Sequence, residues 1–302
     1  MKKNLLILIV IFSFNSSIAQ PKISFTFDDG MTSARPGYSF ERWNEMILEH
    51  LEASDLKAIF FVTGFNKIDE KGKYLLNSWD EKGHKIANHT FSHLNYNSDK
   101  TTFQKFQWEF LKTDSIISEY NNYLRLFRFP YLKEGNTRQK IDLFRNFLNE
   151  KKYKNGYVTI DASDWYIDSR LVKRLRESRG ADLENFKKFY IEHLLERASY
   201  YENLSYKLTG RHINHTLLLH HNLAAALFLG DLIKAFKQNG WEVIDADKAY
   251  DDPIFDKQPD NVPAGESLIW ALIKETGKFD DLLRYPAEDS RYEKDKMDKL
   301  GL

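Results

Sequence analysis

The apolar and polar positions of this chain change period repeatedly, from short apolar runs to stretches with helical spacing. Short runs rich in aromatic and β-branched residues are typical of buried strands. Such runs occupy residues 22–27, 58–62, 84–88, 124–129, 157–160, 216–220 and 242–244. Apolar residues at helical spacing fill most of the intervals, at residues 40–56, 74–81, 102–120, 137–151, 182–203 and 223–238. This alternation predicts a parallel sheet covered by helices, either closed into a barrel or open and doubly wound.

The N-terminus has the three regions of a secretory signal peptide. Lys2 and Lys3 precede an apolar run at residues 5–14, and small residues follow up to Ala19. The run is too short to span a bilayer core of roughly 30 Å as a helix. We therefore expect cleavage after Ala19 and export of the mature protein, to a periplasm or out of the cell, with no membrane attachment.

The C-terminal part of the chain loses the alternation. Residues 251–263 predict a loop, residues 265–277 predict one helix, and the charged residues from Glu288 onward predict a loosely attached tail. The stretch between the strands at 157–160 and 216–220 is long for a connection within a barrel, so we expect it to overhang the cleft. The expected parts are a signal peptide at 1–19, one α/β domain at 20–250 with an insertion at 166–215, and an extension at 251–302.

Composition restricts the classes of partner. With 42% hydrophobic residues among 302, the chain can bury a sizeable core. Lysine plus arginine and aspartate plus glutamate both number 44, so no net charge attracts nucleic acid or anionic lipid, and we expect neither as a partner. The absence of cysteine excludes disulfides, thiolate metal ligands and a cysteine nucleophile.

The first predicted strand ends in two adjacent carboxylates, Asp28 and Asp29, followed by Gly30. Two carboxylates this close cannot both ionise comfortably in a partly buried site unless a cation neutralises one of them or the pKa of one is raised. Both outcomes suit hydrolytic chemistry. An ordinary polar turn explains these three residues equally well when they are taken alone.

Two histidines follow the strand at 84–88. His89 and His93 are four residues apart, so on a helical turn both imidazoles would project to one side and could reach one metal ion. Taken alone, such a pair is more often two surface histidines. Together with a carboxylate at another strand end they give an Asp-His-His set with open positions, which is typical of a catalytic metal site.

Three further strands also end in polar residues. Arg128 precedes Pro130, Asp161 and Asp164 follow the strand at 157–160, and His220 closes an apolar run. A structural arginine and a satisfied core histidine are the ordinary explanations for such residues. The carboxyl ends of parallel strands meet at one edge of a sheet, however, so five polar strand ends predict one site.

These residues carry a resemblance to a known family. The chain resembles the polysaccharide deacetylase family, also called the NodB-homology family, through Thr-Phe-Asp-Asp-Gly at 26–30, His-Thr-Phe-Ser-His at 89–93, Arg-Phe-Pro-Tyr at 128–131, Asp-Ala-Ser-Asp-Trp at 161–165 and Leu-Leu-His at 218–220. The resemblance implies an α/β fold, a distorted (β/α) barrel of about seven parallel strands. It also implies one divalent metal ion, zinc by default with cobalt or nickel as alternatives, held by Asp29, His89 and His93.

The resemblance further implies roles for two acid–base pairs. Asp28 would be the general base, held by Arg128. His220 would be the general acid, oriented by Asp164. A histidine can protonate a leaving amine near neutral pH, which agrees with this role.

Three more residues would bind the substrate. Trp165 and Leu218 would line the acetyl pocket, and the backbone N–H of Tyr131 would help to bind the oxyanion. The chain departs from the family at Leu132, where glycine is usual, and at His221, where an acidic residue is frequent. The second departure leaves open the choice between His220 and His221 as the acid. Adjacent strand residues face opposite ways, so only one can serve, and His220 is preferred because the strand should end there.

The resemblance implies a metal-dependent hydrolase that removes N-acetyl groups from the amino sugars of a glycan or oligosaccharide. An O-acetyl polysaccharide esterase of the same fold is the nearest alternative. A non-catalytic carbohydrate-binding relative should have lost its base or a metal ligand, whereas Asp28, Asp29, His89 and His93 are all present. A structural protein with surface histidines would bind no metal.

Overall fold

A computed structural model describes residues 20–284 and 290–302. The predicted signal peptide lies outside the described residues. Within them, no helix is long and apolar enough to cross a membrane.

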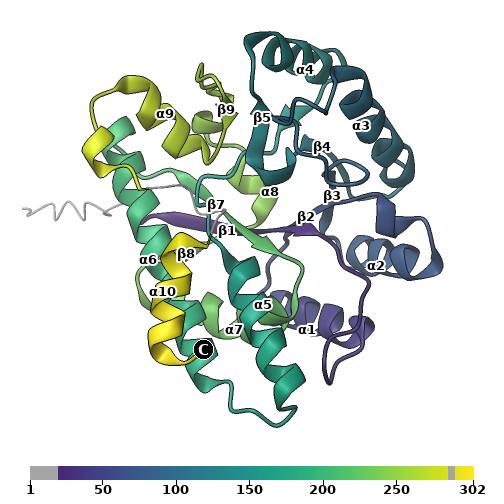
Figure 1. The fold of residues 1–302 in the computed structure, drawn as a ribbon, viewed down its shortest axis with the longest axis vertical. Helices are drawn as coiled ribbons and strands as arrows, with labels where there is room; N and C mark the ends of the chain where they lie inside the picture. Colours follow the sequence, from purple (N-terminus) through teal and green to yellow (C-terminus); the bar gives the residue numbers. More distant parts are fainter. Residues whose placement is uncertain (1–19, 285–289) are drawn as a thin grey trace, which may run out of the picture.

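A parallel sheet forms the centre of the fold (Figure 1). Its strands run in the order β6-β4-β3-β2-β1-β7, and β8 pairs with the beginning of β1. Every pairing in this sheet is parallel. The strands are β1 (Lys22–Asp29), β2 (Ile59–Val62), β3 (Lys85–Asn88), β4 (Tyr123–Phe127), β6 (Lys154–Asn155), β7 (Asn214–His220) and β8 (Glu242–Val243).

One irregular segment joins the two ends of the sheet. Beyond β6, Gly156 donates its N–H to Phe127 O at 2.7 Å, and Ile160 pairs with Leu217 of β7 as an isolated parallel bridge. The predicted strand at 157–160 is therefore wrong, since the regular pairing is at Lys154–Asn155. Gly156 explains the change, because a Cβ there would lie 2.4 Å from the Phe61 ring, so the chain crosses close over that ring. The sheet is thus curled into a distorted barrel, which confirms the expected fold class.

Helices surround the sheet (Figure 1). Several begin at side-chain caps that satisfy their free N–H groups; Asn222, for example, accepts from Ala225 N at 2.9 Å. The helices are α1 (Phe40–Ala53), α2 (Glu70–Glu81), α3 (Phe103–Ile117), α4 (Arg138–Glu150), α5 (Asp164–Glu177), α6 (Glu184–Thr209), α7 (Leu223–Gln238), α8 (Ala246–Ala249), α9 (Leu268–Thr276) and α10 (Arg291–Leu300). Short 3₁₀ helices are η1 (Phe65–Lys67), η2 (Pro130–Leu132), η3 (Pro253–Asp256) and η4 (Asp280–Leu282).

The insertion and the extension both pack onto the domain. Of the insertion, α6 packs against α7 and α9 rather than over the cleft, while α5 begins beside it. Two short strands, β5 (Lys133–Gly135) and β9 (Ala264–Gly265), pair antiparallel and attach the extension to the loop after β4. The charged end is not a loose tail from Ser290 onward: α10 buries Met297 in the core and Glu293 beside His193 of α6.

Candidate active site

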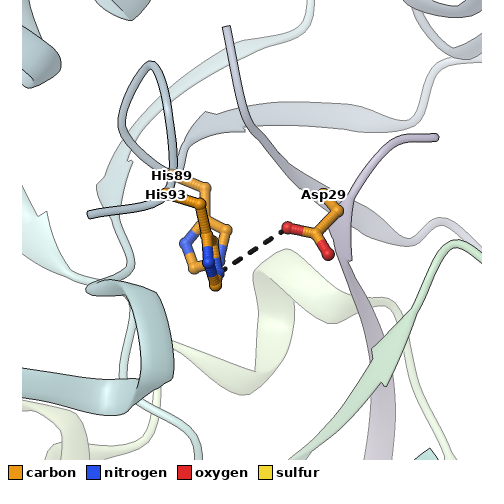
Figure 2. Close-up of side chains that lie close together, drawn as sticks. All are labelled: Asp29, His89 and His93. Atoms are coloured by element: carbon orange, nitrogen blue, oxygen red, sulfur yellow. Dashed lines mark ion pairs between the residues drawn. The ribbon is translucent and has the colours of Figure 1, made fainter. Parts of the chain in front are cut away.

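Three candidate metal ligands converge at the carboxyl edge of the sheet. Asp29 ends β1, and His89 and His93 come from the loop after β3. Their ligand atoms lie within 4.8 Å of one another, and Asp29 Oδ1 is 3.7 Å from His93 Nε2. Figure 2 shows the two imidazoles pointing toward the carboxylate from the opposite loop. The sheet register explains the meeting, because Asp29, Val62 and Asn88 are aligned on β1, β2 and β3.

The loop after β3 is not the helical turn that the spacing of the histidines suggested. Thr90 and His93 both have left-handed backbones, with φ of 65° and 60°. Two hydrogen bonds hold this shape, from Thr90 N to Asn88 Oδ1 at 2.9 Å and from His93 N to Thr90 Oγ1 at 3.2 Å. Asp29 is also left-handed, with φ of 76°. Non-glycine residues in this region cost conformational energy and are often found at functional sites.

The protonation of the three side chains suits a divalent cation. His89 Nδ1 lies 2.8 Å from Arg128 O, so this nitrogen carries the proton and Nε2 is left to bind a metal. Burial lowers the pKa of His93 to about 4, which keeps its imidazole neutral. Burial alone would raise the pKa of Asp29, but its interactions with His93 and then with His220 lower it below its usual value. Two imidazoles and one carboxylate form a donor set that several first-row metals accept.

Asp28 is buried and held by Arg128. Asp28 Oδ1 accepts from Arg128 Nη1 at 2.5 Å, and its other oxygen lies 3.6 Å from His89 Nε2. The guanidinium is fixed in turn by Gly156 O at 2.9 Å and by Thr26 Oγ1 at 2.9 Å. The contact that the family resemblance implies is therefore present, and it orients the carboxylate beside the metal ligands.

His220 is paired with Asp164. Its Nδ1 lies 2.7 Å from Asp164 Oδ1, and its backbone N–H donates to Asp164 Oδ2 at 2.9 Å. Asn222 donates to the same oxygen at 2.9 Å. Burial alone would lower the pKa of His220, but the carboxylates of Asp164 and then of Asp29 raise it to about 10. Residues 28 and 220 are aligned on β1 and β7, so this imidazole faces the same cleft as Asp28.

His221 faces away from the cleft. Its ring lies in the core, 4.3 Å from the Trp43 ring and 5.2 Å from the Trp79 ring between centroids, and its Nε2 is 3.0 Å from Asn44 Oδ1. Burial lowers its pKa well below the usual value. Of the two candidate acids, only His220 lies where it can reach a substrate.

A cleft of about 320 Å³ contains these groups. Its volume suits a small substituent with part of the ring that carries it. The residues that line it are Asp28, Asp29, His89, His93, Tyr131, Leu132, Asp161, Ala162, Trp165, Leu218 and His220. All three predicted substrate-binding residues are among them.

One wall of the cleft is apolar. Leu132, which replaces the usual glycine of the family, packs with Val158 and Leu218. Tyr131 and Leu132 both have left-handed backbones, with φ of 57° and 55°. Trp165 stands at the rim with 37% of its surface exposed. Leu132 thus places a bulky side chain in the wall of the cleft from a left-handed backbone position.

Sequence reasoning missed two partners of Arg128. Thr26 carried a usable signal, because it is two residues before Asp28 and therefore lies on the same face of β1. Tyr250, whose hydroxyl accepts from Arg128 Nη2 at 3.2 Å, follows α8 and has no local pattern that marks it. A third missed residue, Lys67, lies under Asp29 and donates to its carbonyl at 3.1 Å.

Comparisons with known proteins agree with this site. Residues 16–145 match the family model described as polysaccharide deacetylase. A peptidoglycan-N-acetylglucosamine deacetylase of Bacillus cereus is 28% identical over 155 residues, 51% of this chain and 50% of that protein. The chain therefore spans half the length of this curated relative. These matches confirm the resemblance to the polysaccharide deacetylase family.

Solved structures share the fold at low identity. A peptidoglycan N-acetylglucosamine deacetylase in complex with an N-oxidanyl-benzamide compound has a TM-score of 0.53 at 19% identity, covering 77% of this chain and 91% of that one. The peptidoglycan deacetylase PdaC from Bacillus subtilis has a TM-score of 0.52 at 20% identity, with the same coverage. A mutant of a Bacillus anthracis CE4 family pseudoenzyme with restored enzymatic activity has a TM-score of 0.52 at 19% identity, covering 76% of this chain and 67% of that one. At these identities the likeness shows the fold alone.

Proposed function

We propose that this chain, which matches the polysaccharide deacetylase family model over residues 16–145, is a metal-dependent hydrolase that removes N-acetyl groups from the amino sugars of a glycan or oligosaccharide. The observation that carries the proposal is the joint presence in one cleft of an Asp-His-His set, a buried carboxylate beside it and a histidine paired with aspartate. A pseudoenzyme should lack one of these parts.

Asp29, His89 and His93 would hold the metal ion. When bound, a divalent cation supplies Lewis acidity, which polarises an amide carbonyl and makes water easier to deprotonate. Zinc is our first expectation, and cobalt or nickel would suit the same two nitrogens and one oxygen.

Asp28 is placed to act as general base. Its Oδ2 lies 3.6 Å from His89 Nε2, so a water molecule near the metal set would be within its reach. Arg128 occupies the other oxygen of the carboxylate and fixes its orientation. In this arrangement Asp28 accepts a proton from the attacking water.

His220 is placed to act as general acid. Asp164 holds its Nδ1, which leaves Nε2 toward the cleft. The high pKa of this imidazole means that a proton is available for the departing amine at neutral pH. Asp164 therefore orients the ring and stabilises its protonated form, in the way that aspartate serves histidine in other hydrolases.

The walls of the cleft would select the acetyl group. Leu218 and Leu132 supply the apolar side, and Trp165 offers a partly exposed ring at the rim, where a sugar could stack. The N–H of Tyr131 is the candidate donor to the oxyanion. The relative from Bacillus cereus bears the name of a deacetylase for peptidoglycan N-acetylglucosamine, so polymers of N-acetylglucosamine are the first substrates to test.

The test is acetate release by residues 20–302, the chain expected after signal cleavage, from a panel of N-acetylated and O-acetylated glycans, with and without chelator. We expect release from N-acetylated glycans that stops with chelator and returns with zinc or cobalt. Release confined to O-acetylated polymers would instead assign the O-acetyl esterase activity. Binding of glycans without any release would assign the non-catalytic alternative.

A further inference from the structure

A buried lysine lies directly beneath the candidate metal set. Lys67, at the end of η1, is 1% exposed. Its Nζ lies close to four oxygens, 2.6 Å from Gly30 O, 3.1 Å from Asp29 O, 2.6 Å from Asn66 Oδ1 and 3.4 Å from Thr63 O. None of these partners is a carboxylate. Lys67 therefore forms no ion pair with these partners and instead donates mainly to backbone carbonyls.

The surroundings favour an ammonium group. A charged lysine has three N–H donors and no acceptor, which matches a shell made only of oxygens, whereas a neutral amine would turn its lone pair toward one of them. Burial lowers the pKa of Lys67 to about 7, while the carboxylates of Asp29 and Asp69 act in the opposite direction.

The turn that Lys67 grips is the one that carries Asp29. Asp29 and Gly30 both have left-handed backbones, with φ of 76° and 73°, and the carbonyls of both accept from Lys67. A Cβ on Gly30 would lie 2.8 Å from Lys67 Nζ and 2.7 Å from the Trp79 ring, so glycine is what permits this approach. Thr63 adds two hydrogen bonds to Asp29 O, at 3.1 Å from its N and 3.0 Å from its Oγ1.

We propose that Lys67 is a positioning residue of the metal site, which fixes the strained Asp29–Gly30 turn so that the Asp29 carboxylate faces His89 and His93. Outer partners of metal ligands commonly hold the ligand in a productive direction, although they touch no metal themselves. This inference rests on the proposed metal site.

Charge and positioning predict opposite effects of removing the lysine. An ammonium near the site repels a divalent cation, so by charge alone its loss would tighten metal binding. If Lys67 holds the turn, its loss lets the backbone of Asp29 relax from a left-handed conformation, and metal binding weakens. The sign of the change therefore separates the two roles.

The experiment compares Lys67→Met with Lys140→Met as a matched control. Lys140 Nζ also donates to two loop carbonyls, Tyr96 O at 3.1 Å and Ser98 O at 2.8 Å, but neither belongs to a candidate ligand. Dissociation constants for Zn²⁺ and Co²⁺ are measured by chelator competition, and melting of the metal-free proteins measures stability. We expect Lys67→Met to weaken binding by about 10- to 100-fold, as is typical of such partners, and Lys140→Met to leave it within about threefold.

Unchanged or tighter metal binding in Lys67→Met would overturn the inference, and so would equal weakening in both variants. Should Lys67→Met fail to fold, Asn66→Ala serves in its place, because Asn66 both accepts from Lys67 Nζ and donates to Gly30 O at 3.0 Å. We expect it to weaken binding by several fold, and unchanged binding would overturn the inference. A wild-type chain that binds neither metal would overturn the proposed metal site itself, which is a separate result.

Discussion

At the scale of single residues, the buried ion pair between Asp28 and Arg128 decides what a mutation at the proposed base can test. The Asp28→Asn side chain keeps the shape of the carboxylate but cannot take a proton, so acetate release should fall by about 10²- to 10⁴-fold, the usual contribution of a general base. Metal content should persist, because Asp28 is not among the three candidate ligands. Acetate release and metal content are measured on the same preparation.

The same substitution also leaves Arg128 without its carboxylate, and losing one partner of a buried pair costs about 3–5 kcal/mol of stability. Arg128→Gln is the control, since it breaks the pair but keeps the base. It should lose similar stability and retain more turnover than Asp28→Asn. Turnover of Asp28→Asn within a few fold of the wild type would contradict the assigned role.

The two neighbouring histidines predict different losses. His220→Ala should reduce hydrolysis of N-acetyl amides by about 10²- to 10⁴-fold, because the amine must be protonated as it leaves. Activated aryl acetates, whose leaving group needs no proton, should suffer much less. His221→Ala should lower stability through the cavity it leaves beside Trp43 and Trp79, and should keep the ratio of amide to aryl-ester turnover.

The measurement is that ratio in each variant, with the melting temperature alongside. A ratio unchanged in His220→Ala, or an amide-specific loss confined to His221→Ala, would show that the acid is the other residue. In the sequence, alternation along the strand indicates that only one of the two can serve, and the expected end of the strand at residue 220 favours His220.

At the scale of elements, local pattern predicted the helices that carry their own signals. Residues 223–238 form α7 as expected, since apolar spacing and the Asn222 cap both lie within the segment. The helix α10 was not predicted, because its one core residue, Met297, gives no apolar periodicity. Its other buried residue, Glu293, pairs with His193 of α6, a contact that no local pattern indicates. The strands β5 and β9 are also non-local, since residues more than 120 positions apart in the chain pair with each other. A local sequence pattern cannot predict pairing between segments so far apart in the chain.

The candidate site likewise has parts that the sequence predicts and parts that it does not. Its chemical groups were predictable because each follows an apolar run, and parallel strands bring such ends together. The residues that hold these groups in place were not predictable. The sequence around Lys67 is polar and suggests an exposed side chain, and only the fold shows that Lys67 is buried against Asp29. The left-handed backbones of Asp29 and His93 could not be predicted from the sequence either, because neither residue is glycine.

The contact of α5 with α7 predicts a pH-dependent stability. Asp168 of α5 accepts from Ala224 N, at the start of α7, at 2.9 Å. Burial raises the pKa of this carboxyl to about 6, above its usual value near 3.9 in unfolded chains. The folded state therefore binds the proton more tightly, so this contribution to stability is complete below about pH 4 and is lost as the pH rises through 6.

Asp168→Asn removes the titration while keeping an oxygen that can accept from Ala224. The free energy of unfolding of Asp168→Asn minus that of the wild type should be about 2 kcal/mol larger at pH 7 than at pH 4, because only the wild type loses stability over this range and each pKa unit corresponds to about 1.4 kcal/mol. Urea unfolding at the two pH values gives the difference. Val172→Ala, on the same helix, carries no charge and should show a constant difference. A constant difference in Asp168→Asn would refute the prediction.

At the scale of the whole molecule, the C-terminal extension supports one wall of the cleft. Ser267 Oγ donates to Thr159 O at 2.9 Å, and Leu268 N donates to Val158 O at 2.7 Å. Val158 in turn packs with Leu132 and Leu218 in the apolar wall. The segment that joins the two ends of the sheet is therefore backed by residues from beyond position 250, and the shape of the cleft depends on both.

The candidate metal set also links distant parts of the chain, since Asp29 ends β1 while His89 and His93 follow β3, with β2 between these strands. A metal bound only by the folded chain should therefore stabilise the whole molecule. At free Zn²⁺ about 100 times its dissociation constant, the gain in unfolding free energy is about 2.7 kcal/mol. For a chain of this size, that corresponds to a rise in melting temperature of roughly 4–5 °C. We expect this rise on adding zinc and its reversal by chelator, measured by thermal unfolding of residues 20–302.

Each variant is compared with itself, with and without metal, so that its own loss of stability cancels. His89→Ala should show almost no zinc-dependent rise, because the cation loses a ligand that Arg128 O otherwise holds in place. His212→Ala is the matched control: this histidine pairs with Glu202, outside the cleft, and its removal should leave the rise intact. Equal rises in the two variants would place the metal elsewhere, and no rise in the wild type would remove the metal from the mechanism.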